Sequence, residues 1–233
     1  MRHCLILTGG RLNLQFAREY CRTLSYDTVY AVDRGLEYAK QLGLVPDYIV
    51  GDFDTVDAGV LAAYEKQIQC GELASVFERH PVKKDATDTE LALQKAMEEG
   101  AEQITLLAAT GSRMDHVLAN LGLLLQTARR GISCFMVDET NRIQLLCAEH
   151  RSCQISRAGQ HGRYVSVLPF AGSVCGLTME GVLYPLKEFD LEPGSSLTVS
   201  NEIVEELAVI SIRQGQLLVI ESADRWNVDV AKR

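Results

Sequence analysis

The sequence predicts an α/β protein with a mainly parallel sheet and helices, followed by an antiparallel β-sandwich. Two observations predict this fold class. Over the first 140 or so residues, short apolar runs alternate with amphipathic stretches of helical length, as in βαβ units. From about Glu149, helical periodicity gives way to short β-like runs punctuated by glycine and proline at hairpin spacing. We therefore expect an α/β domain at residues 1–148 and a β-sandwich at residues 149–233.

The expected elements follow in chain order. Apolar runs of strand length in the first domain are Cys4–Leu7, Thr28–Val32, Tyr48–Val50, Ser75–Glu78, Ile104–Ala108 and Ser133–Val137. Amphipathic stretches that predict helices are Asn13–Leu24, Leu36–Leu42, Ala58–Gln67, Asp88–Glu98 and Asp115–Arg129. The second domain offers strands at Cys153–Ser156, Tyr164–Leu168, Val182–Tyr184, Ser196–Val199, Leu207–Ile212 and Gln216–Ile220. Open parallel sheets bind ligands beyond the carboxyl ends of their strands, so the loops after the first-domain strands are the ones to inspect.

Composition excludes several classes of function. The 233 residues include 23 Lys and Arg against 31 Asp and Glu, a net charge of −8. No basic cluster offers a face for nucleic acid or an anionic membrane surface. No apolar run reaches the roughly 18–20 residues of a membrane span, and the first residues read as a strand and turn. Seven scattered cysteines without a Cys-x-x-Cys pair favour free thiols and a cytoplasmic protein.

The first acidic motif is Gly51-Asp52-Phe53-Asp54, directly after an expected strand. In an extended chain Asp52 and Asp54 would face the same side while Phe53 packs inward. Two carboxylates so close repel each other unless a cation lies between them, and oxygen ligands suit Mg²⁺. A solvated acidic turn in which Asp54 caps a helix explains the same residues.

Two further motifs each open an expected helix. Thr87 and Glu90 fit a capping box that leaves Asp85 unexplained, so Asp85 and Asp88 are candidates for the same metal or substrate as the first pair. The second motif runs from Ala109 to His116 and follows a strand, where backbone N–H groups favour phosphate. Its Arg113 has a guanidinium fork suited to phosphate oxygens. Helix capping by Thr87 and Glu90, and by Ser112 and Asp115, is a structural explanation of the same segments. His116 is then a packed residue.

The ordered set of motifs resembles the thiamine pyrophosphokinase family over nearly the whole chain. It consists of Asp33-Arg34-Gly35, Gly51-Asp52-Phe53-Asp54, Lys84-Asp85-Ala86-Thr87-Asp88-Thr89-Glu90, Gly111-Ser112-Arg113-Met114-Asp115-His116 with Asn120, Pro169-Phe170, Gly176–Leu186 and Thr198-Val199-Ser200-Asn201-Glu202. The family's first motif often reads Asp-Gly-Gly, and some members carry an aromatic residue soon after the Ser-Asn pair. This chain has Arg34 at the middle of the first motif and Glu202 after Asn201.

The resemblance implies a Rossmann-like nucleotide domain, a thiamine-binding β-sandwich and a homodimer with active sites shared between subunits. It implies Mg²⁺-dependent transfer of pyrophosphate from ATP to thiamine, giving thiamine diphosphate and AMP. Carried over by residue, the metal and catalytic carboxylates are Asp52, Asp54, Asp85 and Asp88, joined in catalysis by Arg113. The nucleotide side would comprise Asp33, Gly111, Ser112, Arg113, Asp115 and His116. Residues lining the thiamine pocket would be Lys84, Thr87, Thr198, Ser200 and Asn201.

Two other functions remain open from the sequence. One is a different Mg²⁺-dependent phosphoryl or nucleotidyl transferase on the same scaffold, with another alcohol acceptor. The other is a non-catalytic protein that senses a nucleotide or thiamine. Clustered carboxylates favour the catalytic readings, because a sensor has no need to hold repelling charges together.

Overall fold

The computed structural model describes residues 1–82 and 85–224. The chain divides into two compact units, Met1–Leu123 and Leu124–Arg233, and each is described by itself. The units meet in sequence within one helix, α5 (Met114–Ala128). The functional division expected between residues 148 and 149 stays a prediction.

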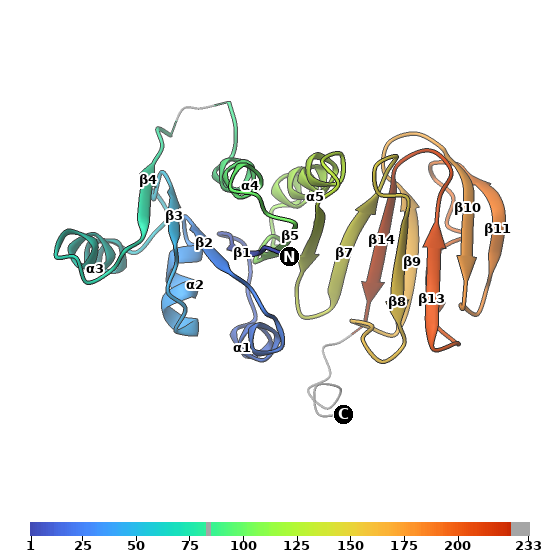
Figure 1. Cartoon of the computed structure of the whole chain (residues 1–233), viewed down its shortest axis with the longest axis horizontal. Coiled ribbons are helices and arrows are strands. Elements are labelled where there is room, and N and C mark those ends of the chain that lie inside the picture. The colour runs from blue at the N-terminus through green and yellow to red at the C-terminus, as the bar shows by residue number, and fades with distance from the viewer. Residues whose placement is uncertain (83–84, 225–233) are drawn as a thin grey trace. The chain divides into compact units, whose positions relative to one another are not determined.

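The first unit is built on a parallel sheet in the strand order β5-β1-β2-β3-β4. Its strands are β1 (His3–Leu7), β2 (Thr28–Val32), β3 (Tyr48–Gly51), β4 (Val76–Arg79) and β5 (Gln103–Leu107). Its helices, besides the start of α5, are α1 (Leu14–Thr23), α2 (Gly35–Leu42), α3 (Ala58–Gln69) and α4 (Asp88–Glu98). Helices α1 and α2 lie on one face of the sheet and α4 on the other, as Figure 1 shows. The predicted α/β architecture is confirmed.

Local sequence explains where these elements begin and end. The strands β1 and β2 are buried along their whole length, which matches continuous apolar runs in a sheet covered on both faces. The side chain of Asn13 accepts hydrogen bonds from the N–H groups of Gln15 and Phe16 and so begins α1. Thr87 accepts from the N–H of Glu90 at 3.2 Å and begins α4 as the capping pattern predicts. Gly43, at φ 71°, ends α2 in the left-handed conformation that glycine favours.

The second unit packs two β-sheets around one core. One sheet has the order β6-β7-β14-β9-β12, with β6 (Ser133–Val137), β7 (Asn141–Leu146), β14 (Leu217–Ser222), β9 (Tyr164–Pro169) and β12 (Asn201–Glu202). The other has the order β11-β10-β13-β8, with β11 (Leu186–Leu191), β10 (Val174–Glu180), β13 (Leu207–Ser211) and β8 (Ser152–Ser156). All of these pairings are antiparallel. Side chains such as Val167, Val219, Leu177 and Ile210 meet in a single apolar cluster, which confirms the predicted sandwich.

Two predicted strands of the second unit are wrong. Residues 196–199 form a turn, because the hydroxyl of Thr198 donates to the carbonyl of Val167 at 2.5 Å and turns the segment inward. Val182–Tyr184 makes one isolated bridge, from Val182 to Ile203, in place of a strand. The sequence analysis also missed β7, β10, β11 and β12.

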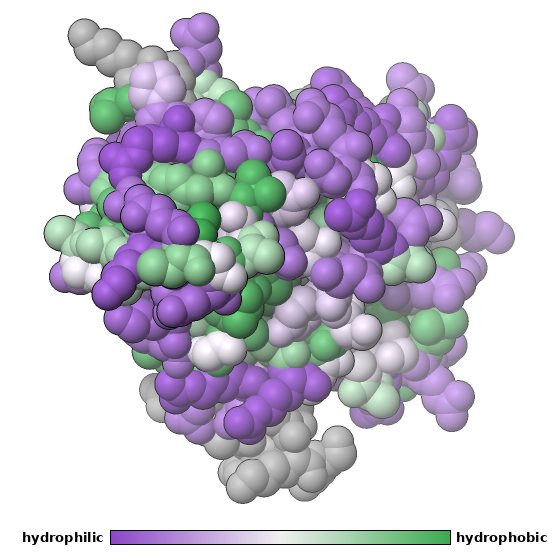
Figure 2. Space-filling view, turned by 60° about the vertical axis from the view of Figure 1, so that its left-hand side comes forward, coloured by the Kyte–Doolittle hydropathy of each residue, from purple (hydrophilic) through white to green (hydrophobic). Residues whose placement is uncertain are grey.

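Figure 2 shows hydrophilic side chains over most of one face, with hydrophobic side chains in smaller patches between them. Among the described residues, no helix has the length and apolar character needed to cross a membrane.

Candidate functional site

The loops at the carboxyl ends of β1, β2, β3 and β5 line one cavity of about 870 Å³ in the first unit. This is the position at which open parallel sheets bind ligands. Its walls include residues 8–12 after β1, Asp33 and Arg34 after β2, Asp52, Asp54 and Thr55 after β3, residues 85–89 at the start of α4, and residues 108–113 after β5. Tyr38, Val82, His116, Val117 and Asn120 complete the lining.

Three carboxylates converge in this cavity. One oxygen from each of Asp33, Asp52 and Asp88 lies within 4.8 Å of the other two. Asp33 and Asp52 are half-buried, whereas Asp88 is only 8% exposed. Carboxylate oxygens gathered from three elements form the donor set that hard divalent cations prefer.

The chain is bent to bring these carboxylates together. Asp33, Phe53 and Ala108, at the ends of β2, β3 and β5, have φ values of 46°, 64° and 57°, a region that costs energy for residues other than glycine. Gly51 leaves room for Asp33, because a Cβ there would overlap the Asp33 Oδ1 atom. The same Oδ1 accepts a hydrogen bond from the N–H of Phe53 at 3.3 Å.

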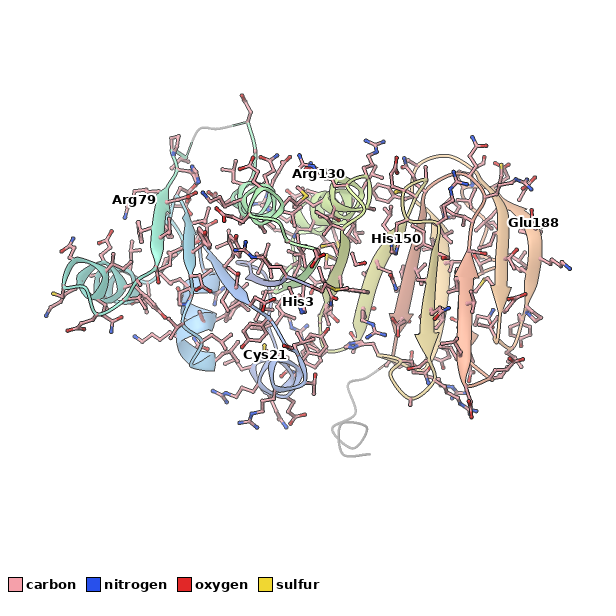
Figure 3. The ribbon with its side chains drawn as sticks, in the orientation of Figure 1. His3, Cys21, Arg79, Arg130, His150 and Glu188 are labelled. Carbon is pink, nitrogen blue, oxygen red and sulfur yellow. The ribbon has the colours of Figure 1, made fainter. Side chains whose placement is uncertain are left out.

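Phe53 packs inward as predicted, but the chain around it is not extended. Its buried ring stacks on Phe77 with centroids 4.9 Å apart, and the guanidinium of Arg79 lies 5.4 Å from the Phe53 centroid. Arg79 is labelled in Figure 3 at the end of β4. The left-handed turn at Phe53 separates Asp54 from Asp52, so both line the cavity while only Asp52 joins the converging group. The alternative role of Asp54 as a helix cap is wrong, since Asp57 caps α3 by accepting from the N–H of Val60.

Asp85 also lines the cavity without joining the converging group, and Asp33, which the sequence placed on the nucleotide side, takes part in it. Thr87 lines the cavity from its capping position. Lys84 lies outside the described residues.

The segment after β5 contributes Gly111, Ser112, Arg113 and His116 to the lining, but Asp115 lies outside it. The Arg113 guanidinium donates to both oxygens of Asp115, at 3.2 and 2.5 Å. That hydrogen bond lowers the pKa of the Asp115 carboxyl to about 2. Both side chains are well exposed, 70% and 63% respectively, so this ion pair is open to solvent.

The first and last loops of the site are joined by hydrogen bonds, and of the residues that make them the sequence analysis named Asn120 and the segment from Ala109 but gave no role to Gly10, Arg11 or Tyr38. The N–H groups of Gly10 and Arg11 donate to the carbonyls of Ala108 and Thr110 at 2.8 and 2.7 Å. The hydroxyl of Tyr38 donates to the Gly10 carbonyl at 2.7 Å, and the buried amide of Asn120 donates to Ala109 at 2.8 Å. The signal that could have found the Gly10 loop is its place at the end of the first strand.

The predicted second-domain residues lie in the second unit. Thr198 and Asn201 are 2% and 4% exposed, and both hold backbone in place. The Asn201 side chain donates to the carbonyl of Tyr184 and accepts from its N–H, at 2.9 and 3.0 Å. Ser200 is exposed with φ 59°, and its N–H donates to the hydroxyl of Ser166. This segment therefore presents Ser200 from a turn that is held by hydrogen bonds.

Comparisons with known proteins match both units. A family model described as "Thiamin pyrophosphokinase, catalytic domain" matches residues 23–136, and "Thiamin pyrophosphokinase, vitamin B1 binding domain" matches residues 152–217. A thiamine pyrophosphokinase of Bacillus subtilis (strain 168) is 31% identical over 193 residues, which cover 83% of this chain and 86% of the relative.

Solved structures give the same result. A crystal structure of thiamine pyrophosphokinase from Bacillus subtilis has a TM-score of 0.83 and 28% identity, over 96% of this chain and 100% of that one. A thiamin pyrophosphokinase from Geobacillus thermodenitrificans has a TM-score of 0.78 and 30% identity, over 96% of this chain and 98% of that one. Sequence and fold thus point the same way across both units.

Proposed function

The chain belongs to the thiamin pyrophosphokinase family, and from that premise we propose that it transfers pyrophosphate from ATP to the hydroxyl of thiamine, giving thiamine diphosphate and AMP. Members of this family are transferases that use ATP as co-substrate. The observation that carries the proposal is the convergence of Asp33, Asp52 and Asp88 in a cavity at the strand ends. Transfer of phosphoryl groups depends mainly on positioning and on neutralising charge, and this cavity offers groups for both.

The residues fit Mg²⁺. This ion takes oxygen ligands and is commonly held by one or two carboxylates together with substrate phosphates. Asp33, Asp52 and Asp88 would hold it, with Asp54 and Asp85 as further acidic members of the same wall. When bound, Mg²⁺ offsets the negative charge of the ATP phosphates.

The chain's own groups account for the rest of the reaction. The thiamine hydroxyl oxygen forms a bond to the β-phosphorus of ATP as the bond to the bridging oxygen breaks, and that oxygen leaves with AMP. Asp54 or Asp88 accepts the hydroxyl proton, since both carboxylates line the cavity. The backbone at Gly111 and Ser112 precedes α5 and suits phosphate, and Arg113 and His116 supply donors beside it. Asp115 orients the Arg113 guanidinium through its paired hydrogen bonds.

Thiamine binding completes the proposal. Thr87 and Lys84 would contact thiamine from the catalytic domain, residues 1–148. The β-sandwich domain, residues 149–233, would line the thiamine pocket with Thr198, Ser200 and Asn201. The two domains would come from different subunits of a homodimer. All seven cysteines are free thiols, which supports a reducing cytoplasm as the working compartment.

The test is incubation with ATP, Mg²⁺ and thiamine, followed by mass analysis of both products. Thiamine diphosphate with AMP is the expected pair. Thiamine monophosphate with ADP would replace the proposal with an ordinary kinase, and saturable binding without any product would replace it with a sensor.

A matched pair of variants locates the chemistry. Asp52→Asn removes one converging carboxylate and should lower kcat about 100-fold or more with an unchanged far-UV circular dichroism spectrum. Glu98→Gln makes the same change of charge at the exposed end of α4, outside the cavity, and should leave kcat unchanged. Near-normal turnover by Asp52→Asn would remove this carboxylate from the site.

A further inference from the structure

Arg34 lines the cavity at the middle position of the first motif, where the resembling family often has glycine, and the proposed function gives it no role. It stands between Asp33 of the converging carboxylates and Gly35, the first residue of α2. A Cβ at Gly9 would lie 3.6 Å from the Cβ of Arg34, so the base of the Arg34 side chain lies next to the loop that follows β1. Arg34, Gly9 and Tyr38 all line the cavity.

The guanidinium of Arg34 is held by two neighbours in α2. Its Cζ lies 5.7 Å from the centroid of the Tyr38 ring, and its Nε lies 3.9 Å from the Glu37 carboxylate. Both neighbours are themselves held by hydrogen bonds. The hydroxyl of Tyr38 donates to the carbonyl of Gly10, and the carboxylate of Glu37 accepts from the N–H of Asp57 at 2.9 Å. The side chain is still 53% exposed. A planar donor group is therefore kept at the cavity wall without being closed off from a ligand.

Charge decides what such a group would bind. Among the described lining residues, five aspartates face three arginines, Arg11, Arg34 and Arg113. The Arg113 guanidinium donates to both Asp115 oxygens, at 3.2 and 2.5 Å, whereas the Glu37 carboxylate is 3.9 Å from Arg34. A nucleotide triphosphate brings several negative charges into a wall that is already acidic, so it needs cationic donors close to the carboxylates. Arginine matches phosphate oxygens with two parallel donors.

We infer that Arg34 binds the phosphate chain of the nucleotide and sets the preference of the site for a polyphosphate. This inference rests on the proposed function for the identity of the nucleotide. The guanidinium of Arg34 donates to phosphate oxygens, while Asp33, one residue earlier, is one of the three converging carboxylates. Arg34 thus adds a second guanidinium to the phosphate site besides Arg113.

The test measures binding, which does not depend on turnover. Calorimetric titration of the full chain with inorganic tripolyphosphate in MgCl2, and separately with adenosine, compares wild type with Arg34→Gln. We expect tripolyphosphate to bind about tenfold more weakly to the variant, the effect of losing a hydrogen bond to a charged group. Adenosine should bind equally to both proteins. Arg34→Lys, which keeps the charge but loses the fork, should recover only part of the loss.

The outcomes separate this inference from its alternatives. Equal binding of tripolyphosphate to wild type and Arg34→Gln would overturn it. Weaker binding of adenosine to Arg34→Gln, with unchanged binding of tripolyphosphate, would also overturn it and would place the guanidinium next to the nucleotide base. Arg22→Gln, the same change at an exposed position in the last turn of α1, is the control and should bind as wild type does.

Failure of the proposed function would look different. A wild-type chain that binds tripolyphosphate through Arg34 but forms no thiamine diphosphate refutes the function and leaves the inference standing. A wild-type chain that forms thiamine diphosphate and AMP while Arg34→Gln binds tripolyphosphate normally refutes the inference alone.

Discussion

Gly10→Ala tests the hydrogen bonds between the loop after β1 and the loop after β5, the first and last loops of the site. A Cβ at Gly10 would overlap the carbonyl oxygens of both Ala108 and Thr110. Those oxygens accept the hydrogen bonds that hold the loops together, from the N–H groups of Gly10 and Arg11 at 2.8 and 2.7 Å. Relief of the overlap requires the loops to separate by about 1 Å, which takes both bonds beyond hydrogen-bonding distance.

The cost follows from the bonds that are lost. Two backbone hydrogen bonds contribute about 0.5–1.5 kcal/mol each. The free energy of unfolding of the variant should therefore be about 1–3 kcal/mol lower than that of wild type. Urea denaturation followed by far-UV circular dichroism measures this difference. The displaced loop also carries the segment that ends in Arg113, so affinity for ATP should fall in the same variant, as calorimetry would show.

Gly122→Ala provides the control for this prediction. Gly122 lies within α5 with nothing within 4 Å of an added Cβ, so alanine there should stabilise the chain by about 0.5–1 kcal/mol through helix propensity. If Gly10→Ala were as stable as wild type and bound ATP equally well, the loops would not be held together as described.

Two further predictions concern the second unit. Glu221 is 1% exposed and accepts from Arg142 at 2.6 and 2.7 Å, so Glu221→Gln should lower the free energy of unfolding by about 3 kcal/mol in urea denaturation, because it leaves the arginine charge uncompensated. An unchanged urea midpoint would mean that the buried pair is dispensable. Burial lowers the pKa of His161, whose Nε2 is 2.8 Å from the Asp138 carbonyl oxygen. A group with a lowered folded pKa binds its proton more readily when unfolded, so stability should fall as the pH drops below about 6.5. His161→Gln should flatten this acid slope in urea titrations at several pH values, and an equal slope in both proteins would assign the acid sensitivity to other groups.

The fold of the first unit was predictable because its signal is local. Fully buried parallel strands such as Thr28–Val32 are continuous apolar runs, and the capping pattern at Thr87 marks the start of α4 directly. The sandwich strands gave weaker signals. Leu186–Leu191 carries charged residues on exposed positions, and Val174–Glu180 is interrupted by Gly176 at φ 66°, with shifts of register. Neither pattern alternates regularly, so neither reads as a strand.

The acidic site was predictable in its location but not in its membership. The strand-end rule placed the aspartates at one edge of the sheet. An extended chain would have turned Asp52 and Asp54 to one side, but Phe53 between them is in the left-handed conformation, and only Asp52 of the two joins the converging oxygens. Asp33 enters the group because Gly51, on the neighbouring strand, leaves space for its carboxylate. Backbone conformation of this kind depends on tertiary packing, which residue spacing does not record.

Each converging carboxylate also has a stabilising contact from the chain itself. Asp33 accepts from the N–H of Phe53, and Asp52 accepts from the N–H of Asp54 at 3.2 Å. Asp88 lies in the first turn of α4, where the partial positive charge of the helix end favours a carboxylate. We therefore expect the three carboxylates to keep this arrangement without a cation, and we expect a cation that binds them to add stability by linkage.

This argument predicts separate effects of Asp52→Asn with and without Mg²⁺. At 100 times its dissociation constant a ligand stabilises the folded state by about 2.7 kcal/mol, and loss of one of three carboxylates should remove most of that gain. Without the ion, the variant should lose no more than about 1 kcal/mol, the worth of one hydrogen bond. Urea titrations with MgCl2 or with EDTA measure both quantities. If Asp52→Asn unfolded in EDTA, the carboxylate would be structural, and an undiminished response to Mg²⁺ would place the ion elsewhere.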